Sequence, residues 1–228
     1  TVAVQALTAL ATNHQVKLSL TDGAGVFLAA GSVAAHVALR TARAHRPTLP
    51  SAGAFNASYF LLMALLRQQA RLVYASAPLL IAAVRGLLCA LAHAAPGAAP
   101  AAQAQDGSSG DAGGTIDADG DDSLPAGAQL PIECARNMRR LLEQIAEHKA
   151  ALVRHCSYLL ADVVSVCKER PLPAAGMAEL LPGIHALLGM CTEIEVQVVH
   201  AASDGGKQRV LKEMLESYER SFKHRGKV

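Results

Sequence analysis

The sequence predicts an all-α fold, an irregular α-solenoid of armadillo/HEAT-like helical pairs with a disordered acidic insertion. Three observations lead to this prediction. The 228 residues are 51% hydrophobic but only 4% aromatic, so alanine and leucine supply most of the apolar surface, which favours close-packed helices. Apolar residues recur at helical spacing, and no long run alternates with a period of two. One predicted helix is apolar almost all round, which is typical of a helix covered on two sides, as in stacked repeats.

The distribution of charge divides the chain into three segments. Residues 1–95 carry seven lysines and arginines against one aspartate, and we expect a helical repeat segment there. Residues 96–130 carry six aspartates and no basic residue, and their alanine-, glycine- and aspartate-rich composition predicts a disordered insertion. Residues 131–228 are nearly neutral and are expected to form a C-terminal helical domain. Because the first residue is Thr1, we also expect the chain to be the last part of a longer protein.

Four helices are predicted in the first segment. We expect them over residues 1–13, from a cap at Thr21 and Asp22 to about residue 44, over residues 54–71 and over residues 77–93. Pro47 and Pro50 end the second helix, because proline cannot continue a helix.

Two interpretations stay open for residues 72–92, which hold one charge in 21 positions. The first is a membrane span, because about 20 apolar residues cross a bilayer. The second, which we favour, is a solenoid helix buried between its neighbours. Pro78 and the many alanines speak against a span, and Arg85 near its middle would cost roughly 2.5–3.5 kcal/mol.

The C-terminal segment is predicted to contain five helices. The first follows Pro131, with four apolar residues inward (Met138, Leu141, Leu142 and Ile145) and three arginines outward (Arg136, Arg139 and Arg140). The second covers residues 149–169 and is the one that is apolar nearly all round. The third covers residues 174–190, and Pro182 inside it should either kink the helix or begin a new one.

The last two helices are predicted from their caps. Thr192 and Glu195 have the spacing of a capping box, so a helix should begin there and bury Ile194, Val198 and Ala201. The final helix follows residues 203–206. Its apolar face holds Leu211, Leu215, Tyr218 and Phe222, and Glu216 and Arg220 are spaced as an ion pair.

We predict no catalytic, cofactor or metal site. The five cysteines form no Cys-x-x-Cys pair and are expected to be free thiols. Two histidines and two cysteines (His148, His155, Cys156 and Cys167) lie close enough in sequence for a metal site to be considered. The cysteines fall in the apolar stripe, however, so we favour core thiols. The acidic run Asp117–Asp121 imitates a calcium loop, but its glycine is misplaced and position twelve is Ala128, not glutamate.

A basic tip at the C-terminus is the one surface with a candidate binding role. The residues proposed for contact with rRNA or a partner are Arg220, Lys223, His224, Arg225 and Lys227. Clustered positive charge neutralises phosphates with a salt-dependent affinity. The alternative interpretation is a solvated helix end, because Glu213, Glu216 and Glu219 are interspersed with the cations further back along the same helix.

Three groups of residues carry a resemblance to a known family. They are Arg154–Asp162 (RHCSYLLAD), Arg170–Pro173 (RPLP) with Leu180–Leu188 (LLPGIHALL), and the ending Leu211–His224 (LKEMLESYERSFKH). Together they resemble the C-terminal domain of the nucleolar Urb2/Npa2 (Urb-two/Npa-two) family, the "unhealthy ribosome biogenesis" proteins. The resemblance covers residues 132–227 well and residues 17–94 more weakly.

The resemblance implies a function that the residue patterns alone do not. It implies a non-enzymatic scaffold in the nucleolus, which supports assembly and pre-rRNA processing of early large-subunit precursors. The implied partners are a large solenoid of the Urb-one/Npa-one type and a DEAD-box helicase, with pre-rRNA peripheral and with no membrane and no small-molecule substrate. The alternative from the pattern alone is a helical-repeat adaptor for protein–protein interaction unrelated to ribosomes.

Overall fold

The computed structural model describes residues 2–13, 16–44, 49–94 and 126–223, and these are all-α. No strand occurs among these residues. The helices are α1 (Val2–Thr12), α2 (Leu20–Ala44), α3 (Leu49–Gln68), α4 (Ala70–Ala75), α5 (Ala77–Ala94), α6 (Ala126–Glu147), α7 (Lys149–Glu169), α8 (Ala174–Met190), α9 (Glu193–Ala201) and α10 (Gly205–Lys223).

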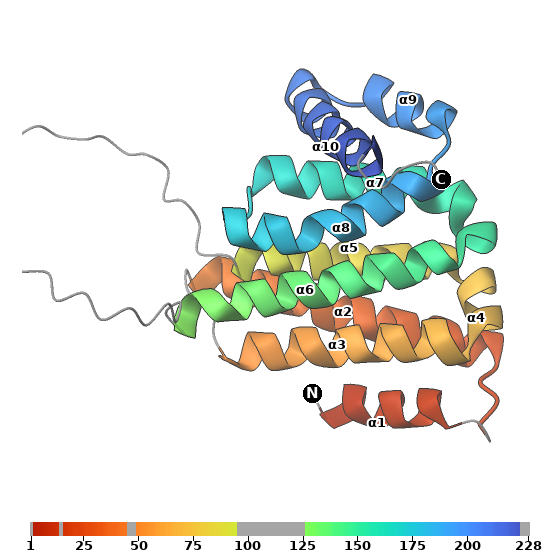
Figure 1. Ribbon diagram of the computed structural model, residues 1–228. Coiled ribbons are helices and arrows are strands. Elements are labelled where there is room, and N and C mark those ends of the chain that lie inside the picture. Colours follow the sequence, from red (N-terminus) through yellow and green to blue (C-terminus); the bar gives the residue numbers. More distant parts are fainter. Residues whose placement is uncertain (1, 14–15, 45–48, 95–125, 224–228) are drawn as a thin grey trace, which may run out of the picture.

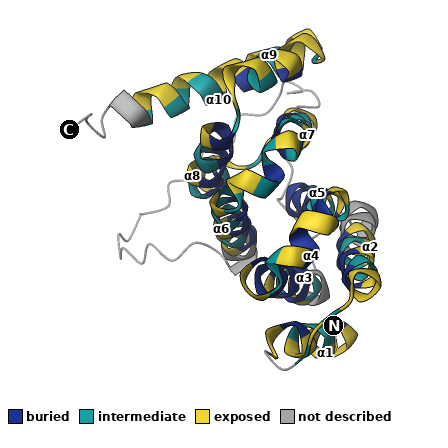
Figure 2. Cartoon of the chain, turned by 90° about the vertical axis from the view of Figure 1, so that its right-hand side faces the viewer, coloured by how far each residue is buried: buried dark blue, intermediate teal, exposed yellow. Residues whose placement is uncertain are grey.

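The long helices are stacked in two rows. Helices α2, α5 and α7 lie in one row and α1, α3, α6 and α8 in the other (Figures 1 and 2). The short helix α4 connects the rows between α3 and α5, and α9 and α10 cover one end of the stack against α7 and α8 (Figure 1). Within the rows, α3, α5 and α6 therefore each contact a neighbour on both sides, and α1, α2, α7 and α8 lie at the row ends.

Small residues let neighbouring helices of one row approach closely. A Cβ atom added to Gly86 would lie 3.1 Å from Cβ of Ala34, and one added to Gly31 would lie 3.5 Å from Cα of Ala83, so α2 and α5 touch almost backbone to backbone. The contact between α6 and α8 is tighter still. A Cβ at Gly183 would lie 2.9 Å from both Cα and the carbonyl oxygen of Arg139.

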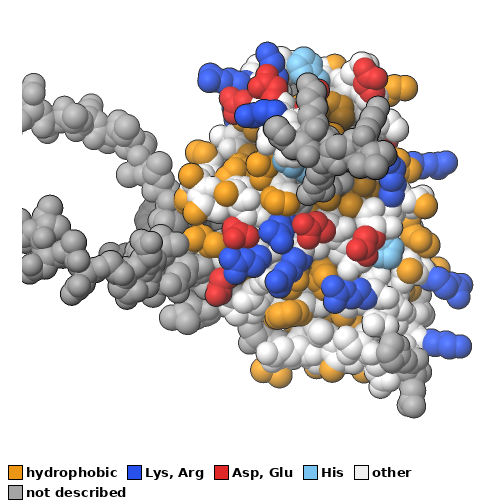
Figure 3. Space-filling view, in the orientation of Figure 1, with side chains coloured by type: hydrophobic (Ala, Val, Ile, Leu, Met, Phe, Trp, Pro, Cys, Tyr) orange, Lys and Arg blue, Asp and Glu red, His pale blue; other side chains and the backbone are white. Residues whose placement is uncertain are grey.

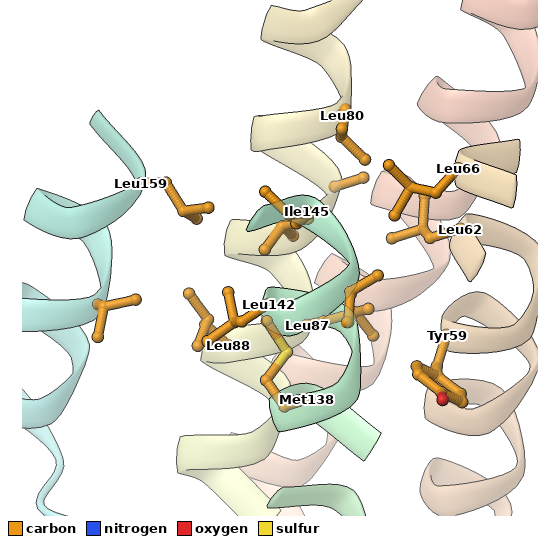
Figure 4. Close-up of a cluster of buried hydrophobic side chains, with 14 of the residues drawn as sticks. Tyr59, Leu62, Leu66, Leu80, Leu87, Leu88, Met138, Leu142, Ile145 and Leu159 are labelled. Atoms are coloured by element: carbon orange, nitrogen blue, oxygen red, sulfur yellow. The ribbon is translucent and has the colours of Figure 1, made fainter. Parts of the chain in front are cut away.

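One hydrophobic core runs through the stack from α1 to α10. Figure 4 shows its centre, where Leu87 and Leu88 from α5 face Met138 and Leu142 from α6, with Leu159 from α7 beside them. The core therefore draws residues from before and after the predicted insertion. Residues 96–125 of that insertion lie outside the described part of the chain, and the division into residues 1–95, 96–130 and 131–228 stays a prediction.

Several predicted helix limits are confirmed and several are wrong. Helices α5, α7 and α8 have the predicted limits to within one residue. Helix α2 is capped by Ser19, not Thr21, because the Ser19 hydroxyl accepts a hydrogen bond from the Asp22 amide (3.1 Å) and its own amide donates to the Asp22 carboxylate (3.0 Å). The predicted helix over residues 54–71 ends at Gln68 and a separate helix follows.

Three prolines that were expected to mark helix ends lie inside helices. Helix α6 begins at Ala126, inside the predicted insertion, and Pro131 is buried within it. Helix α8 continues through Pro182, so of the two outcomes expected for this proline, a kink or a new helix, the start of a new helix is wrong. Pro50 lies in the first turn of α3, where a missing amide donor costs little.

The apolar run over residues 72–92 is divided between two helices and faces the core. The chain turns at Ser76, and in α5 the side chains of Leu80, Leu87 and Leu91 are buried. Among the described helices, α7 is the one long and apolar enough to cross a bilayer, judged by length and composition alone. Core helices pass the same test, and seven residues of α7 are buried in this fold.

Helix α9 buries the face opposite to the one predicted. Val199 is buried and Val196 is partly covered, whereas Ile194 and Val198 are 72% and 58% exposed and Ala201 is exposed. The expectation of a buried Ile194–Val198–Ala201 stripe is therefore wrong. The physical reason is that α9 has only nine residues and lies across the end of the stack, so the position of α7 decides which face is covered.

The predicted capping box at the start of α9 is confirmed. The Thr192 amide donates to Glu195 Oε2 (2.7 Å), and the Glu195 amide donates to the Thr192 hydroxyl (3.3 Å). The first of these bonds holds the pKa of Glu195 below its usual value. The contribution of this carboxylate to stability is therefore present at neutral pH and is lost as the pH falls through that lowered pKa.

Replacing Thr192 with alanine should lower the free energy of unfolding by about 1 kcal/mol, because an amide of the first turn of α9 loses its acceptor. Urea denaturation followed by circular dichroism measures this. Thr8→Ala is the matched control, since Thr8 lies mid-helix and its hydroxyl only donates back to the Val4 carbonyl (2.8 Å). Equal losses of stability in the two variants would contradict the capping role.

Candidate interaction surfaces

The described residues show no cluster suited to metal binding. No group of three or more histidines, cysteines, aspartates or glutamates is placed to hold an ion in this part of the chain. Cys156 and Cys167 are buried among apolar side chains, and burial raises the pKa of Cys167 to about 12. Such a thiol stays protonated and does not serve as a ligand or nucleophile at neutral pH. The Asp117–Ala128 stretch considered for calcium lies almost wholly outside the described residues.

One pair of thiols does lie in contact, at the junction of α7 with the α8–α9 turn. The Cys156 thiol donates a hydrogen bond to the Val153 carbonyl (2.8 Å), and Cys191 lies close enough to Cys156 for each thiol to influence the pKa of the other. Burial is the main cause that raises the pKa of both thiols, and the neighbouring Glu195 carboxylate adds to it. The pair is therefore poorly nucleophilic and belongs to the packing of α9 against α7.

The structure places part of the basic tip. Arg220 is exposed near the end of α10, and Lys223 is the last residue of the helix. His224, Arg225 and Lys227 lie outside the described residues. The predicted ion pair between Glu216 and Arg220 is wrong, because Arg220 Nε donates to the Glu216 backbone carbonyl (3.2 Å) and not to its carboxylate.

Acidic residues neutralise much of the remaining positive charge on α10. Glu216 pairs with Lys212 (3.9 Å), and Arg209 Nε lies 3.2 Å from the Glu213 carboxylate. Both are exposed i,i+4 pairs of little energetic weight. In the described part of α10, cations and carboxylates are therefore interspersed, and over its last two turns Arg220 and Lys223 are balanced in number by Glu216 and Glu219.

The arginine cluster of α6 is also tied to carboxylates. Arg136 Nη2 lies 3.0 Å from Glu179 Oε1 on α8, and Arg139 contacts Glu179 (3.6 Å) and Glu143 (3.3 Å). The hydrogen bond from Arg136 is the main cause that lowers the pKa of Glu179. Figure 3 shows the result as a band of alternating blue and red side chains across this face of the molecule. The cluster thus joins α6 to α8 rather than forming a basic patch.

A groove between α5 and α7 was not predicted from the sequence. It is a hollow of about 500 Å³ on the outer side of these two helices. The residues that line it are Pro78, Ile81, Ala82 and Arg85 from α5 and His155, Tyr158, Ala161 and Asp162 from α7.

An ion pair and an exposed aromatic ring distinguish this groove. Arg85 Nε lies 3.5 Å from Asp162 Oδ1, which joins the two helices across the hollow. Burial raises the pKa of Asp162, and the positive charge of Arg85 opposes that shift. Tyr158 is 66% exposed, and the ring centroid of His155 lies 6.5 Å from its own. The groove therefore combines apolar walls, a large exposed ring and a cation at its rim.

A comparison with protein families decides what the chain is. A model described as the Urb2/Npa2 family matches residues 1–227. The chain belongs to the Urb2/Npa2 family. No protein of curated function and no solved structure matches it significantly.

Membership of the Urb2/Npa2 family implies a role in ribosome biogenesis. The match covers the N-terminal half as well, where the resemblance read from the sequence was weaker. Family membership therefore speaks against the alternative of an adaptor unrelated to ribosomes. The family is not known for enzymatic activity.

Two of the sequence segments that carry the resemblance also have structural roles in this fold. Leu180–Leu188 contains the glycine contact between α6 and α8, and Arg154–Asp162 supplies one wall of the α5–α7 groove.

Proposed function

We propose that this chain is a non-enzymatic scaffold in nucleolar ribosome biogenesis, which supports assembly and pre-rRNA processing of early large-subunit precursors. The observation that carries the proposal is the combination of Urb2/Npa2 membership with a stack of helices that buries one continuous core. A rigid stack presents long surfaces for binding without moving parts. Its contribution to assembly is to hold partners at fixed positions.

The stacking geometry supports an armadillo/HEAT-like solenoid. Contacts between α6 and α8 join residues with a nearly constant separation in sequence, which means that the two helices run parallel. The hydrogen bond from Arg136 to Glu179 spans 43 residues, close to the 40–47 residues typical of one such repeat. Between α3 and α6 the corresponding spans are 81 residues (Asn56–Asn137) and 77 residues (Arg67–Gln144), because residues 95–125 intervene.

The main proposed partners are proteins. A large solenoid of the Urb-one/Npa-one type and a DEAD-box helicase would bind the outer surfaces of the stack, within an early large-subunit precursor. Pre-rRNA would be contacted only at the periphery, through Arg220 and the residues that follow it. The mixed charge of the rest of α10 and of the α6–α8 face supports this order, since extended RNA contact needs an uninterrupted basic surface.

Depletion of the protein in cells tests the proposed function. The expected result is a deficit of large ribosomal subunits in sucrose-gradient profiles, with unstable large-subunit precursor rRNA and unchanged small subunits. The tagged protein should be found in the nucleolus. A normal ratio of large to small subunits after complete depletion would contradict the proposal.

Charge reversal at the tip tests the peripheral contact with RNA. In the variant Arg220→Glu/Lys223→Glu/Arg225→Glu, recovery of pre-rRNA with the protein should fall, and the difference from the wild type should be greatest at low salt and should shrink as the salt concentration rises. Each phosphate contact removed lowers the slope of log affinity against log salt by about 0.7–0.9. The control Arg209→Glu/Lys212→Glu reverses cations that already have glutamate partners and should have a smaller effect. Unchanged recovery in the triple variant would exclude contact at the tip.

A further inference from the structure

We propose that the α5–α7 groove is the docking site for an acidic amphipathic helix of a partner protein. An apolar residue of that helix would lie beside Tyr158, and a carboxylate one turn away would bind Arg85. The inference rests on the scaffold function proposed above and deepens it, because it names a surface and the chemistry of the partner.

The walls of the groove favour an apolar side chain. Pro78, Ile81 and Ala82 line one side and Ala161 the other, and the hollow of about 500 Å³ has room for several side-chain groups. Tyr158 is 66% exposed to solvent at this edge of the groove. Tyrosine is enriched in protein interfaces because its ring offers apolar area and its hydroxyl a hydrogen bond at low entropic cost.

The charges at the rim favour an acidic partner. Asp162 is only 19% exposed and its contact with Arg85 is made to Nε, while 65% of the arginine side chain remains exposed. A guanidinium has five N–H donors, so Arg85 retains the capacity to bind a second carboxylate. Arg154 is exposed one helical turn before Tyr158. Among the lining residues the charges of Arg85 and Asp162 balance, so the exposed Arg154 beside them supplies the positive excess at this edge.

The shape of the groove favours a helix. It lies between two neighbouring helices and has apolar walls, with the Arg85–Asp162 pair across it. A helix with apolar residues three and four apart fits such a groove. The adjacent seam between α2 and α5 offers no such groove, because Gly31 and Gly86 bring those backbones into contact. The pair Ile194 and Val198 on α9 is also exposed, but it is flanked by the carboxylates of Glu193 and Glu195, which do not favour an acidic partner. It therefore serves as a control.

Peptide selection on the purified 228-residue chain tests the proposal. A phage-displayed library of helical peptides is selected for binding, and the affinity of the most enriched peptide is measured by fluorescence anisotropy. We expect enriched sequences with two apolar residues at helical spacing and an aspartate or glutamate one turn away. Tyr158→Ser and Arg85→Glu should each weaken binding at least tenfold. A lysine in place of the peptide carboxylate should restore binding to the Arg85→Glu variant.

Two control variants separate a loss of binding at the groove from a general effect on the surface or on folding. Ile194→Ser removes an equally exposed apolar side chain elsewhere and should leave the affinity within twofold. Because Arg85→Glu places a second carboxylate beside Asp162, Arg85→Gln is measured in parallel and should weaken binding without disturbing thermal unfolding.

Three results would overturn the proposal. The first is enrichment of peptides without acidic residues, and the second is unchanged affinity in both Tyr158→Ser and Arg85→Gln. The third is concentration-dependent dimerisation, seen by sedimentation and abolished by Tyr158→Ser, which would assign the groove to a second copy of the chain. Failure of the scaffold function is a separate outcome: large-subunit production would then be normal after depletion, whatever the peptides show.

Discussion

Replacing Leu142 with alanine is expected to lower the free energy of unfolding by about 2–5 kcal/mol, because a fully buried leucine leaves a cavity when it is truncated. Leu142 lies at the centre of the core, between Leu87 and Leu88 of α5 and its own neighbours on α6 (Figure 4). Domains of this size are commonly stable by only about 5–15 kcal/mol, so this loss is a large part of the total. Urea denaturation of the purified chain measures it.

The same experiment tests whether the two helical segments unfold together. Since the core includes residues from α2 to α8 without interruption, the wild type and Leu142→Ala should each show one transition, displaced to lower urea in the variant. Leu28→Ala is the control: Leu28 is 59% exposed on α2, and its truncation should change stability by no more than about 0.5 kcal/mol. Two separate transitions, of which Leu142→Ala shifts only one, would contradict a shared core.

Replacing Gly183 with alanine should destabilise the fold by about 1–3 kcal/mol, although alanine is the better helix former, because the added methyl group overpacks a close contact. The new Cβ would meet the backbone of Arg139 at 2.9 Å. Backbone atoms cannot rotate away as a flexible side chain can. Helices α6 and α8 would therefore separate, which also weakens the ion pair between Arg136 and Glu179 (3.0 Å).

Gly25→Ala is the matched control for Gly183→Ala, and it should have the opposite sign. Gly25 lies in α2 with no atom within 4 Å of its added Cβ, so alanine should stabilise the helix by about 0.5–1 kcal/mol. Thermal unfolding followed by circular dichroism compares the two variants. If both glycine substitutions raise the melting temperature, the close α6–α8 packing is not a feature of the folded protein.

Local patterns in the sequence were sufficient to predict most of the helices. The apolar stripe over residues 149–169 and the capping box at Thr192 depend on residues within one helix, and both appear where they were predicted. The inward residues of α6 were also correct, since Met138, Leu141, Leu142 and Ile145 are all buried. A long amphipathic helix has one clearly apolar face, and that face decides its orientation.

Features that depend on two distant segments could not be predicted. The face that α9 buries depends on where α7 lies, and the groove depends on Arg85 meeting Asp162 from a different helix. The need for glycine at position 183 could not be predicted either, because it arises from the close approach of the α6 backbone at Arg139. An exposed tyrosine near an acidic residue on a mostly apolar helix was the one visible sign of the groove, and it became interpretable only beside α5.

Sedimentation of the tagged, full-length protein through a sucrose gradient tests the central claim most directly. If the chain is a scaffold of early large-subunit assembly, the protein should migrate with large-subunit precursor rRNA, and it should move to light fractions when rRNA synthesis is blocked. Recovery of the protein in light fractions while those precursors are abundant, with no precursor rRNA bound, would contradict the account.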